Sequence, residues 1–256
     1  MIDIHNHILP NVDDGSKSTE ESLAMLKTAI DQGITDVVST VHFQHPKMEK
    51  MNTDYGSLEK KIQLLQNKIG DKIKIHLGAE VYFLPNLLDV KKHNFTVFNH
   101  GKYMLIEFQS YYNHPNYEFE LQKLKISGTT PIIAHPERSL IFRKDINKLI
   151  KLIEIGCLLQ INGGSLLGFF GKKCQAFTKK ILCRDMVHFI ASDSHNIRSR
   201  NFCLNEAYSC AFKLIGSKAT ALVYDNPKKV LSGQDIHRLS VKEENILKQF
   251  LNKYLS

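Results

Sequence analysis

The chain has 256 residues, of which 43% are hydrophobic and 23% charged, and its formal net charge is +8. This composition is typical of a globular protein and excludes the disordered, collagen-like and disulfide-scaffold classes. Its apolar runs are far shorter than the roughly 20 residues of a membrane-spanning helix, and Met1 precedes a strand-like segment rather than a basic leader. We therefore expect one domain over residues 1–256, no membrane insertion and a cytoplasmic location.

The cysteines and the positive charge point to no special class of protein. Five cysteines without a Cys-x-x-Cys spacing argue against a disulfide framework and a zinc ribbon, so we expect buried, reduced thiols. The net charge would suit nucleic acid or an acidic substrate. Because the lysines are spread along the chain in pairs, however, they are typical of solvated helix faces.

Short apolar runs alternate with longer stretches of helical period, which is the pattern of repeated βα units around a parallel sheet. After the first strand, Ser18 and Glu21 form a capping box, and Gly33 marks the end of the helix that follows. We expect strands at residues 1–5, 36–40, 73–79, 103–108, 130–134, 157–162 and 187–192. Further helices are expected at residues 53–68, 116–127, 144–155, 172–182 and 200–214.

The C-terminal tail is also predicted to be helical, at about residues 240–256. It opens with Ser-x-x-Glu and carries Leu247, Phe250, Leu251 and Tyr254 on one face. We expect this helix to dock on the rest of the chain or on a partner, and a homo-oligomer stays open.

Residues of the types that bind metals lie at or after the C-terminal ends of the expected strands. They are His5, His7, His42, Glu80, Glu107, His135, Asp193 and His195, together with Asp14 in the loop after the first strand. In a barrel of βα units these ends converge on one face, where such enzymes build their active sites. Five imidazoles and four carboxylates without a thiolate suit manganese, iron or zinc.

Several sequence blocks carry a resemblance to a known family. They are Met-Ile-Asp-Ile-His-Asn-His at 1–7, Val-Asp-Asp-Gly at 12–15, His42, Gly-Ala-Glu at 78–80, Leu-Ile-Glu-Phe at 105–108, Ala-His-Pro-Glu-Arg at 134–138, Gln-Ile-Asn-Gly-Gly-Ser-Leu-Leu-Gly at 160–168 and Ser-Asp-Ser-His-Asn at 192–196. The sequence resembles the PHP (polymerase and histidinol phosphatase) superfamily of metal-dependent phosphoesterases. Within it, the chain is similar to the bacterial protein-tyrosine phosphatases encoded with capsule and exopolysaccharide systems.

This resemblance implies an α/β fold, a distorted (β/α)7 TIM-like barrel with a trinuclear metal site at the C-terminal ends of its strands. His5, His7, Asp193 and Glu80 would hold one divalent ion. Glu80 would bridge to a second ion held by Glu107 and His135, while Asp14, His42 and His195 would hold the third. Manganese is the expected metal, with iron or zinc as alternatives.

The same resemblance places Arg138 and Arg200 against the substrate phosphate. Because four carboxylates do not neutralise three divalent ions, the site should attract a phosphate monoester, and a metal-activated hydroxide would attack its phosphorus. The implied activity is hydrolysis of phosphotyrosine in protein, with a bacterial tyrosine kinase that controls polysaccharide synthesis as the partner. One departure is Val41, where relatives usually have proline; it bears on local loop geometry and not on the ligand His42.

Other readings of the motifs carry less weight. No cysteine is followed by arginine at the spacing of a cysteine-phosphatase loop, and residues 163–173 lack the spacing of a nucleotide P-loop, so we expect a loop at the barrel mouth. His45 could contact substrate or donate a proton, although a loop histidine is more often solvated. We expect Asp13 to support the turn before Gly15, and Asp3 to orient a ligand histidine.

Two rival functions stay open at this point. One is a PHP phosphoesterase acting on histidinol phosphate or on nucleic acid ends, although nucleic acid is the less favoured substrate. The other is a catalytically inactive PHP domain that only binds a partner.

Overall fold

Seven parallel strands form one sheet whose spatial order follows the chain, β1 to β7. The structure is a computed structural model that describes residues 1–48, 54–98, 101–111 and 114–236. The strands are β1 (Ile2–Asn6), β2 (Asp36–Phe43), β3 (Lys74–Tyr82), β4 (Tyr103–Glu107), β5 (Thr130–Ala134), β6 (Leu158–Asn162) and β7 (Phe189–Ala191). All the predicted strands are present, and β2 continues regularly through Val41, which pairs with Ala79.

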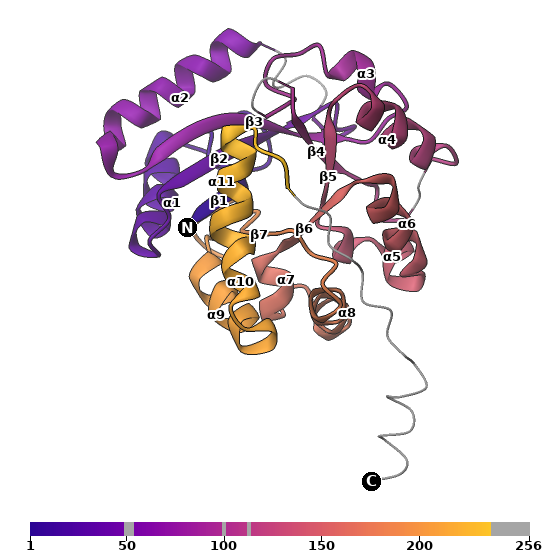
Figure 1. Cartoon of the computed structure of the whole chain (residues 1–256). Coiled ribbons are helices and arrows are strands. Elements are labelled where there is room, and N and C mark those ends of the chain that lie inside the picture. The colour runs from indigo at the N-terminus through magenta and orange to yellow at the C-terminus, as the bar shows by residue number, and fades with distance from the viewer. Residues whose placement is uncertain (49–53, 99–100, 112–113, 237–256) are drawn as a thin grey trace.

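The sheet curls until its first and last strands meet (Figure 1). The N–H of Asp193 donates to the carbonyl of His5 at 2.8 Å, and the N–H of His7 donates to the carbonyl of Ser194 at 2.8 Å. These bonds lie at the C-terminal ends of β1 and β7. The result is a nearly closed seven-stranded barrel of the TIM-like kind, as predicted.

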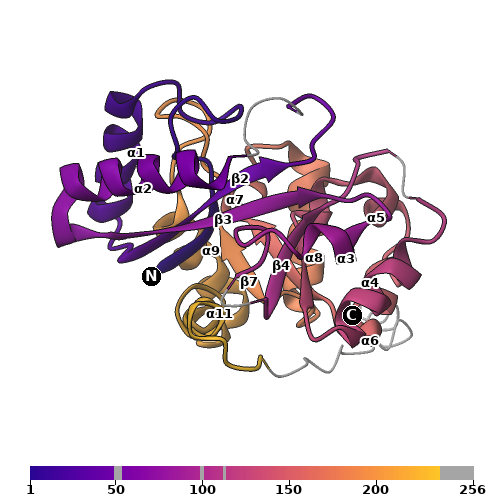
Figure 2. The same ribbon diagram turned by 90° about the horizontal axis from the view of Figure 1, so that it is seen from above.

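Helices surround the barrel, and α1 and α2 lie side by side on one flank (Figure 2). The longer helices are α1 (Thr19–Asp31), α2 (Tyr55–Ile69), α4 (Tyr117–Ile126), α6 (Asn147–Ile155), α8 (Lys172–Cys183) and α9 (Leu204–Ile215). The short ones are α3 (Leu87–Val90), α5 (Leu140–Lys144), α7 (Gly163–Leu167), α10 (Lys218–Thr220) and α11 (Asn226–Ser232), with 3₁₀ turns at Gly70–Lys72 and Pro136–Arg138 and a π turn at Ala221–Asp225. Within the described residues, no helix is long and apolar enough to cross a bilayer.

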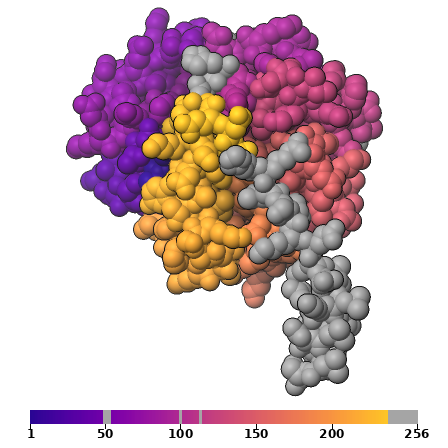
Figure 3. Space-filling view, viewed as in Figure 1, coloured from indigo at the N-terminus to yellow at the C-terminus, as the bar shows by residue number. Residues whose placement is uncertain are grey.

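The expectation of a loop at the barrel mouth needs correction, and the C-terminal part of the chain contains helices that were not predicted. Residues 163–167, expected to be loop, form α7, because Gly163 lets this helix approach α9: a Cβ there would lie 2.9 Å from that of Ala207. Residues 218–232, for which no element was predicted, are helical and lie against the N-terminal part of the chain (Figure 3). The predicted helix at 240–256 lies outside the described residues.

All five cysteines are free thiols, as expected. The expectation of burial is correct for Cys157, Cys174 and Cys203. It is wrong for Cys183, which is exposed on the last turn of α8, and Cys210 is only partly buried.

The hydrophobic core has two parts, one between the strands and the helices and one inside the barrel. Ile4, Val38, Leu105, Leu158 and Phe189 belong to the inner part, and all of them are buried. These side chains fill the barrel below the C-terminal ends of the strands. The inner core therefore forms the floor on which the site described next is built.

Candidate metal centre

Strand alternation places the polar residues directly above the inner core. Leu105 and Glu107 are two residues apart on β4, and Val38 and His42 are four apart on β2, so each pair shares one face of its strand. The inward face thus changes from apolar to metal-binding toward the C-terminal end of each strand. This change is what lets one sheet carry both a packed core and a polar site.

β1 turns His5 and His7 toward the barrel mouth by leaving the regular ladder, because regular alternation after the inward-facing Ile4 would turn both histidines outward. Its pairing with β2 shifts register between Asp3 and Asn6. Such irregularities bend a strand and redirect its side chains. Both imidazoles are fully buried, and their Nε2 atoms lie 3.3 Å apart.

The nine predicted metal ligands come together in one set of overlapping groups. In each group the ligand atoms lie within 4.8 Å of one another; the groups are His7, Asp14, His42 and His195; His5, His7 and Asp193; His5, Glu80 and His135; and His42, Glu80 and Glu107. Glu80 is central, because its Oε1 lies 2.8 Å from Nε2 of His135 and its Oε2 lies 3.2 Å from Nε2 of His5.

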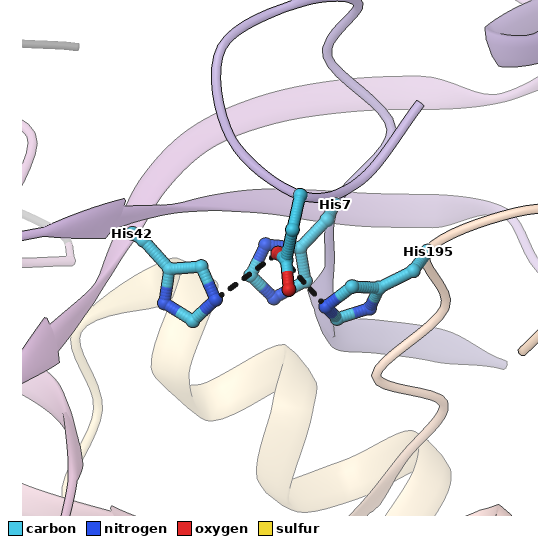
Figure 4. A group of neighbouring side chains, drawn as sticks. His7, His42 and His195 are labelled. Carbon is cyan, nitrogen blue, oxygen red and sulfur yellow. Dashed lines mark ion pairs between the residues drawn. The ribbon is translucent and has the colours of Figure 1, made fainter. Parts of the chain in front are cut away.

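Asp14 reaches this set from the loop after β1. Its Oδ1 lies 3.3 Å from Nε2 of His42 and 3.2 Å from Nε2 of His195. Figure 4 shows the imidazoles of His7, His42 and His195 gathered around this carboxylate. The Asp14 side chain is 48% exposed, so this corner of the set faces the solvent.

The arrangement of donor atoms fits divalent cations. The Nδ1 atoms of His5 and His7 are held at 2.8 Å from Gln160 and 2.9 Å from Asp13, so their Nε2 atoms face one another. Two lone pairs in such contact repel unless a proton or a cation lies between them. In addition, Oε2 of Glu107 is buried and accepts no hydrogen bond among the described residues.

Burial and mutual charge shift the titration of these groups. Burial raises the pKa of Glu107 to about 8, and the neighbouring Glu80 adds to the rise. Burial alone would also raise the pKa of Glu80, but the positive charge on His5 and His42 holds that pKa well below its usual range. Burial and the nearby His7 lower the pKa of His195 to about 4. A cation bound here would take the place of the protons that otherwise balance these carboxylates.

Two of the predicted ligands have a strained backbone. His135 follows β5 with φ of 30°, and Asp193 follows β7 with φ of 53°, both in the left-handed region. Non-glycine residues there cost of order 1–3 kcal/mol each, and such strain clusters at functional sites. The fold tolerates this strain where it turns two ligands into the barrel mouth.

Both predicted phosphate-binding arginines reach the same carboxylate oxygen. Arg138 Nη1 lies 2.8 Å and Arg200 Nη2 2.7 Å from Oδ2 of Asp193. The Arg138 guanidinium also lies 4.7 Å from the centre of the Phe170 ring. Both arginines line a cavity of about 170 Å³ together with seven of the nine ligands.

The sequence profile of the family described as "Capsular polysaccharide synthesis, CpsB/CapC" matches residues 1–232. The chain belongs to the CpsB/CapC family. It is 36% identical over 243 residues to tyrosine-protein phosphatase YwqE of Bacillus subtilis, covering 93% of this chain and 94% of the relative. It is 35% identical over 241 residues to tyrosine-protein phosphatase CpsB of Streptococcus pneumoniae, covering 91% of this chain and 99% of the relative.

A solved structure supports the CpsB/CapC assignment. It comes from work on YwqE of Bacillus subtilis and CpsB of Streptococcus pneumoniae, described there as metal-dependent tyrosine phosphatases. The match has a TM-score of 0.88 at 32% identity and covers 94% of this chain and 98% of that one. An organophosphorus hydrolase mutant matches with a TM-score of 0.58 at 10% identity, covering 90% and 92%, and shows the fold alone.

The structure of this CpsB/CapC member adds site residues whose roles were not predicted. Asp13 supports the Gly15 turn as expected, but its Oδ2 also lies 2.9 Å from Nδ1 of His7. Asp3 accepts the backbone N–H of His5 rather than contacting an imidazole. Gln160 contacts His5 instead, and its place on the inward face of β6 was the signal in the sequence.

The rim of the cavity comes from the segment after β2. His45, Lys47 and Met48 line it, so His45 lies at the site and not in open solvent. The His45 ring lies 4.9 Å from that of His42 and meets Tyr82 edge-on at 5.2 Å. These residues give the entrance an aromatic wall beside a positive charge.

Proposed function

We propose that this CpsB/CapC member is a metal-dependent protein-tyrosine phosphatase, a phosphoric monoester hydrolase. The observation that carries the proposal is the convergence of nine nitrogen and oxygen ligands beside two arginines on one small cavity. Membership of a family whose curated relatives are named tyrosine-protein phosphatases supports the same activity.

The proposed cofactors are three divalent ions, with manganese preferred and iron or zinc as alternatives. His5, His7, Asp193 and Glu80 are proposed to hold the first, Glu80, Glu107 and His135 the second, and Asp14, His42 and His195 the third. When bound, such ions supply Lewis acidity and a hydroxide nucleophile at neutral pH. The nitrogen and oxygen donor set supports this choice of metals.

Arg138 and Arg200 are proposed to bind the phosphate and to stabilise the charge that develops on its oxygens during attack. Planar guanidinium groups match phosphate oxygens in a bidentate fashion. Because the cavity of about 170 Å³ is small beside the 300–1,000 Å³ typical of ligand pockets, it suits a phosphate group better than a whole peptide. The His45 ring, which lines the cavity and packs against Tyr82, is then in place to contact the tyrosine ring.

The proposed partner is a phosphotyrosine protein, namely a bacterial tyrosine kinase that controls capsule or exopolysaccharide synthesis. The family description, which names capsular polysaccharide synthesis, supports this link. The proposed compartment is the cytoplasm, and five free cysteines suit its reducing conditions.

The test measures phosphate release from a phosphotyrosyl peptide by the manganese-loaded protein, beside histidinol phosphate and a DNA end. We expect turnover of the peptide, and its loss in His7→Ala, which removes a ligand shared by two of the groups. His76→Ala is the matched control, because His76 lies on β3 and pairs with Asp36, outside the ligand set.

The other outcomes separate the rival functions. Turnover of histidinol phosphate or DNA with an untouched peptide would keep the metal centre and overturn the substrate. No turnover of any substrate by protein that has taken up manganese would favour a binding domain without catalysis.

A further inference from the structure

Two buried amide side chains on β6 connect two of the proposed metal ligands. Oε1 of Gln160 lies 2.8 Å from Nδ1 of His5, and Nε2 of Gln160 donates to Oδ1 of Asn162 at 3.0 Å. Nδ2 of Asn162 then donates to Oδ2 of Asp193 at 2.6 Å. Gln160 and Asn162 are fully buried, so water does not compete for these bonds.

The carboxylate at one end fixes the direction of every bond in this row. An ionised carboxylate only accepts hydrogen bonds, so Asn162 must present its NH₂ group to Asp193. Its carbonyl oxygen then faces Gln160, which must in turn present its own NH₂ group. The Gln160 oxygen is left facing His5, and the reverse orientation of either amide would bring two acceptors together.

At His5 this direction selects the tautomer. The Gln160 oxygen accepts a hydrogen bond from the N–H at Nδ1 of His5, so Nε2 carries the lone pair. That Nε2 lies 3.2 Å from Oε2 of Glu80 and 3.5 Å from Oδ1 of Asp193. The metal-binding nitrogen therefore points at the carboxylates that would share its ion.

At Asp193 this row of hydrogen bonds gives the two carboxylate oxygens different partners. Oδ2 accepts from Asn162 as well as from Arg138 and Arg200. Oδ1 is left facing the imidazoles of His5 and His7, at 3.5 and 3.6 Å from their Nε2 atoms. Of these three donors only Asn162 is uncharged, and it is the last residue of β6.

We infer that Gln160 and Asn162 are positioning residues for the metal centre, which set the His5 tautomer and turn Oδ1 of Asp193 toward the same ion. This inference rests on the proposed function, because it takes His5 and Asp193 as ligands. Groups that orient ligands in this way typically change metal affinity 10- to 100-fold when they are removed. The residues act through the ligands and need not touch substrate.

The first experiment measures Mn²⁺ affinity by calorimetric titration of the metal-free full chain carrying Gln160→Met. Methionine keeps the length of the side chain and removes the acceptor for His5 and the donor to Asn162. We expect affinity to fall on the order of 10- to 100-fold. The matched control is Gln66→Met, because the Gln66 amide also makes hydrogen bonds, to backbone groups of Gly70, Ile73 and Ile75, but at the N-terminal end of β3, away from the ligands.

A second readout separates positioning from general stability. We measure the melting temperature of each variant in chelator and again with Mn²⁺. Gln160→Met should lose much of the rise that the metal gives, whereas Gln66→Met should lower both temperatures and keep the rise. Gln160→Glu restores an acceptor for Nδ1 of His5, so its affinity should exceed that of Gln160→Met.

Each remaining outcome is decisive. Wild-type Mn²⁺ affinity in a folded Gln160→Met protein would overturn the inference. If that variant does not fold, wild-type affinity in Asn162→Leu, which removes the donor to Asp193, would overturn it in the same way. If His7→Ala also binds Mn²⁺ with wild-type affinity, the proposed ligand set itself is wrong, and the inference falls with it.

Discussion

The chain buries imidazoles in two opposite electrostatic settings. Burial alone would lower the pKa of His7, but Asp13 and Glu80 raise it well above the usual value. His188, directly before β7, has no acidic partner among the described residues: burial lowers its pKa to about 4, and its Nδ1 accepts the N–H of Leu159. His188 is therefore held neutral as a structural acceptor, as expected for a histidine outside the matched blocks.

The lowered pKa of His188 predicts a contribution to stability that is lost in acid. An unfolded histidine titrates near 6.5 and folded His188 near 4, so the unfolded chain binds the extra proton between these values. The free energy of unfolding should therefore fall as pH drops below 6.5, with the full loss reached near pH 4. Between pH 7 and 5 the loss amounts to about 2 kcal/mol.

Urea denaturation in chelator at pH 7 and pH 5 measures this loss. His188→Asn keeps an acceptor for the N–H of Leu159, because its Oδ1 takes the place of Nδ1, but it has no proton to gain. The variant should therefore lose about 2 kcal/mol less than the wild type over this range. Equal losses in the two proteins would show that His188 does not drive the acid sensitivity.

At single residues, the sequence predicted which side chains converge better than it predicted the groups that support them. The convergence of His5 and Asp193 could be predicted because strand ends meet in any βα barrel. The roles of Gln160 and Asn162 could not, because their partners lie on other strands and depend on how the barrel closes. Asp13 was predicted as a turn residue only, since its contact with His7 requires the loop to fold back.

At the scale of elements, the loop between β1 and α1 folds over the end of β1. The N–H of Ser16 donates to the carbonyl of His7 at 3.0 Å, and the N–H of Asn11 donates to the carbonyl of Ser16 at 2.9 Å. Gly15 allows this closure, because a Cβ there would lie 2.2 Å from the carbonyl oxygen of His7. The closure brings the carboxylates of Asp13 and Asp14 to the site.

Gly15→Ala should therefore displace the loop and damage the site. The clash is with backbone, so the loop must move, and a shift of about 1 Å at catalytic groups typically costs about 100-fold in rate. Initial rates with a phosphotyrosyl peptide at saturating Mn²⁺ measure the effect.

The control for this change is Gly56→Ala in the first turn of α2. A Cβ at Gly56 would meet only the side chain of Asp54, at 3.6 Å, so wild-type activity is expected. Wild-type activity in Gly15→Ala would mean that the loop can close without glycine.

Elements with strong local signals were predicted well. Ser18 caps α1 by accepting the N–H of Glu21, as the capping box indicated. The helix α7 was missed because Gly163 and Gly164 have low helix propensity, whereas packing against α9 favours the helix in the folded chain. At α7, packing against a segment distant in sequence therefore outweighs the low local helix propensity.

On the scale of the whole molecule, the proposed ligands join nearly every strand of the barrel. They lie on or directly after β1, β2, β3, β4, β5 and β7. Metal bound to them would therefore hold the barrel together as well as serve the reaction. The order of the strands was predictable, because consecutive βα units in one sheet place each strand beside the last.

Metal removal should lower the stability of the entire chain. At an ion concentration of 1,000 times its Kd, one site stabilises the folded state by about 4 kcal/mol. Melting temperatures with and without a chelator measure this effect. His7→Ala should show a smaller difference between the two conditions than the wild type, because it loses a ligand of the first ion. A wild-type protein that melts identically in both would contradict metal binding by the native barrel.

The closure between β1 and the end of β7 also bears on the order of folding. All other pairings join strands that are neighbours in sequence, so each closes over a single crossover connection, whereas His5 and Asp193 are brought together from the first and last strands of the barrel. Long loop closure costs more entropy and comes late in folding. The binding site for the first ion is thus complete only after the ring has closed, so a nascent chain cannot capture that ion with its full set of ligands until its last strand has been made.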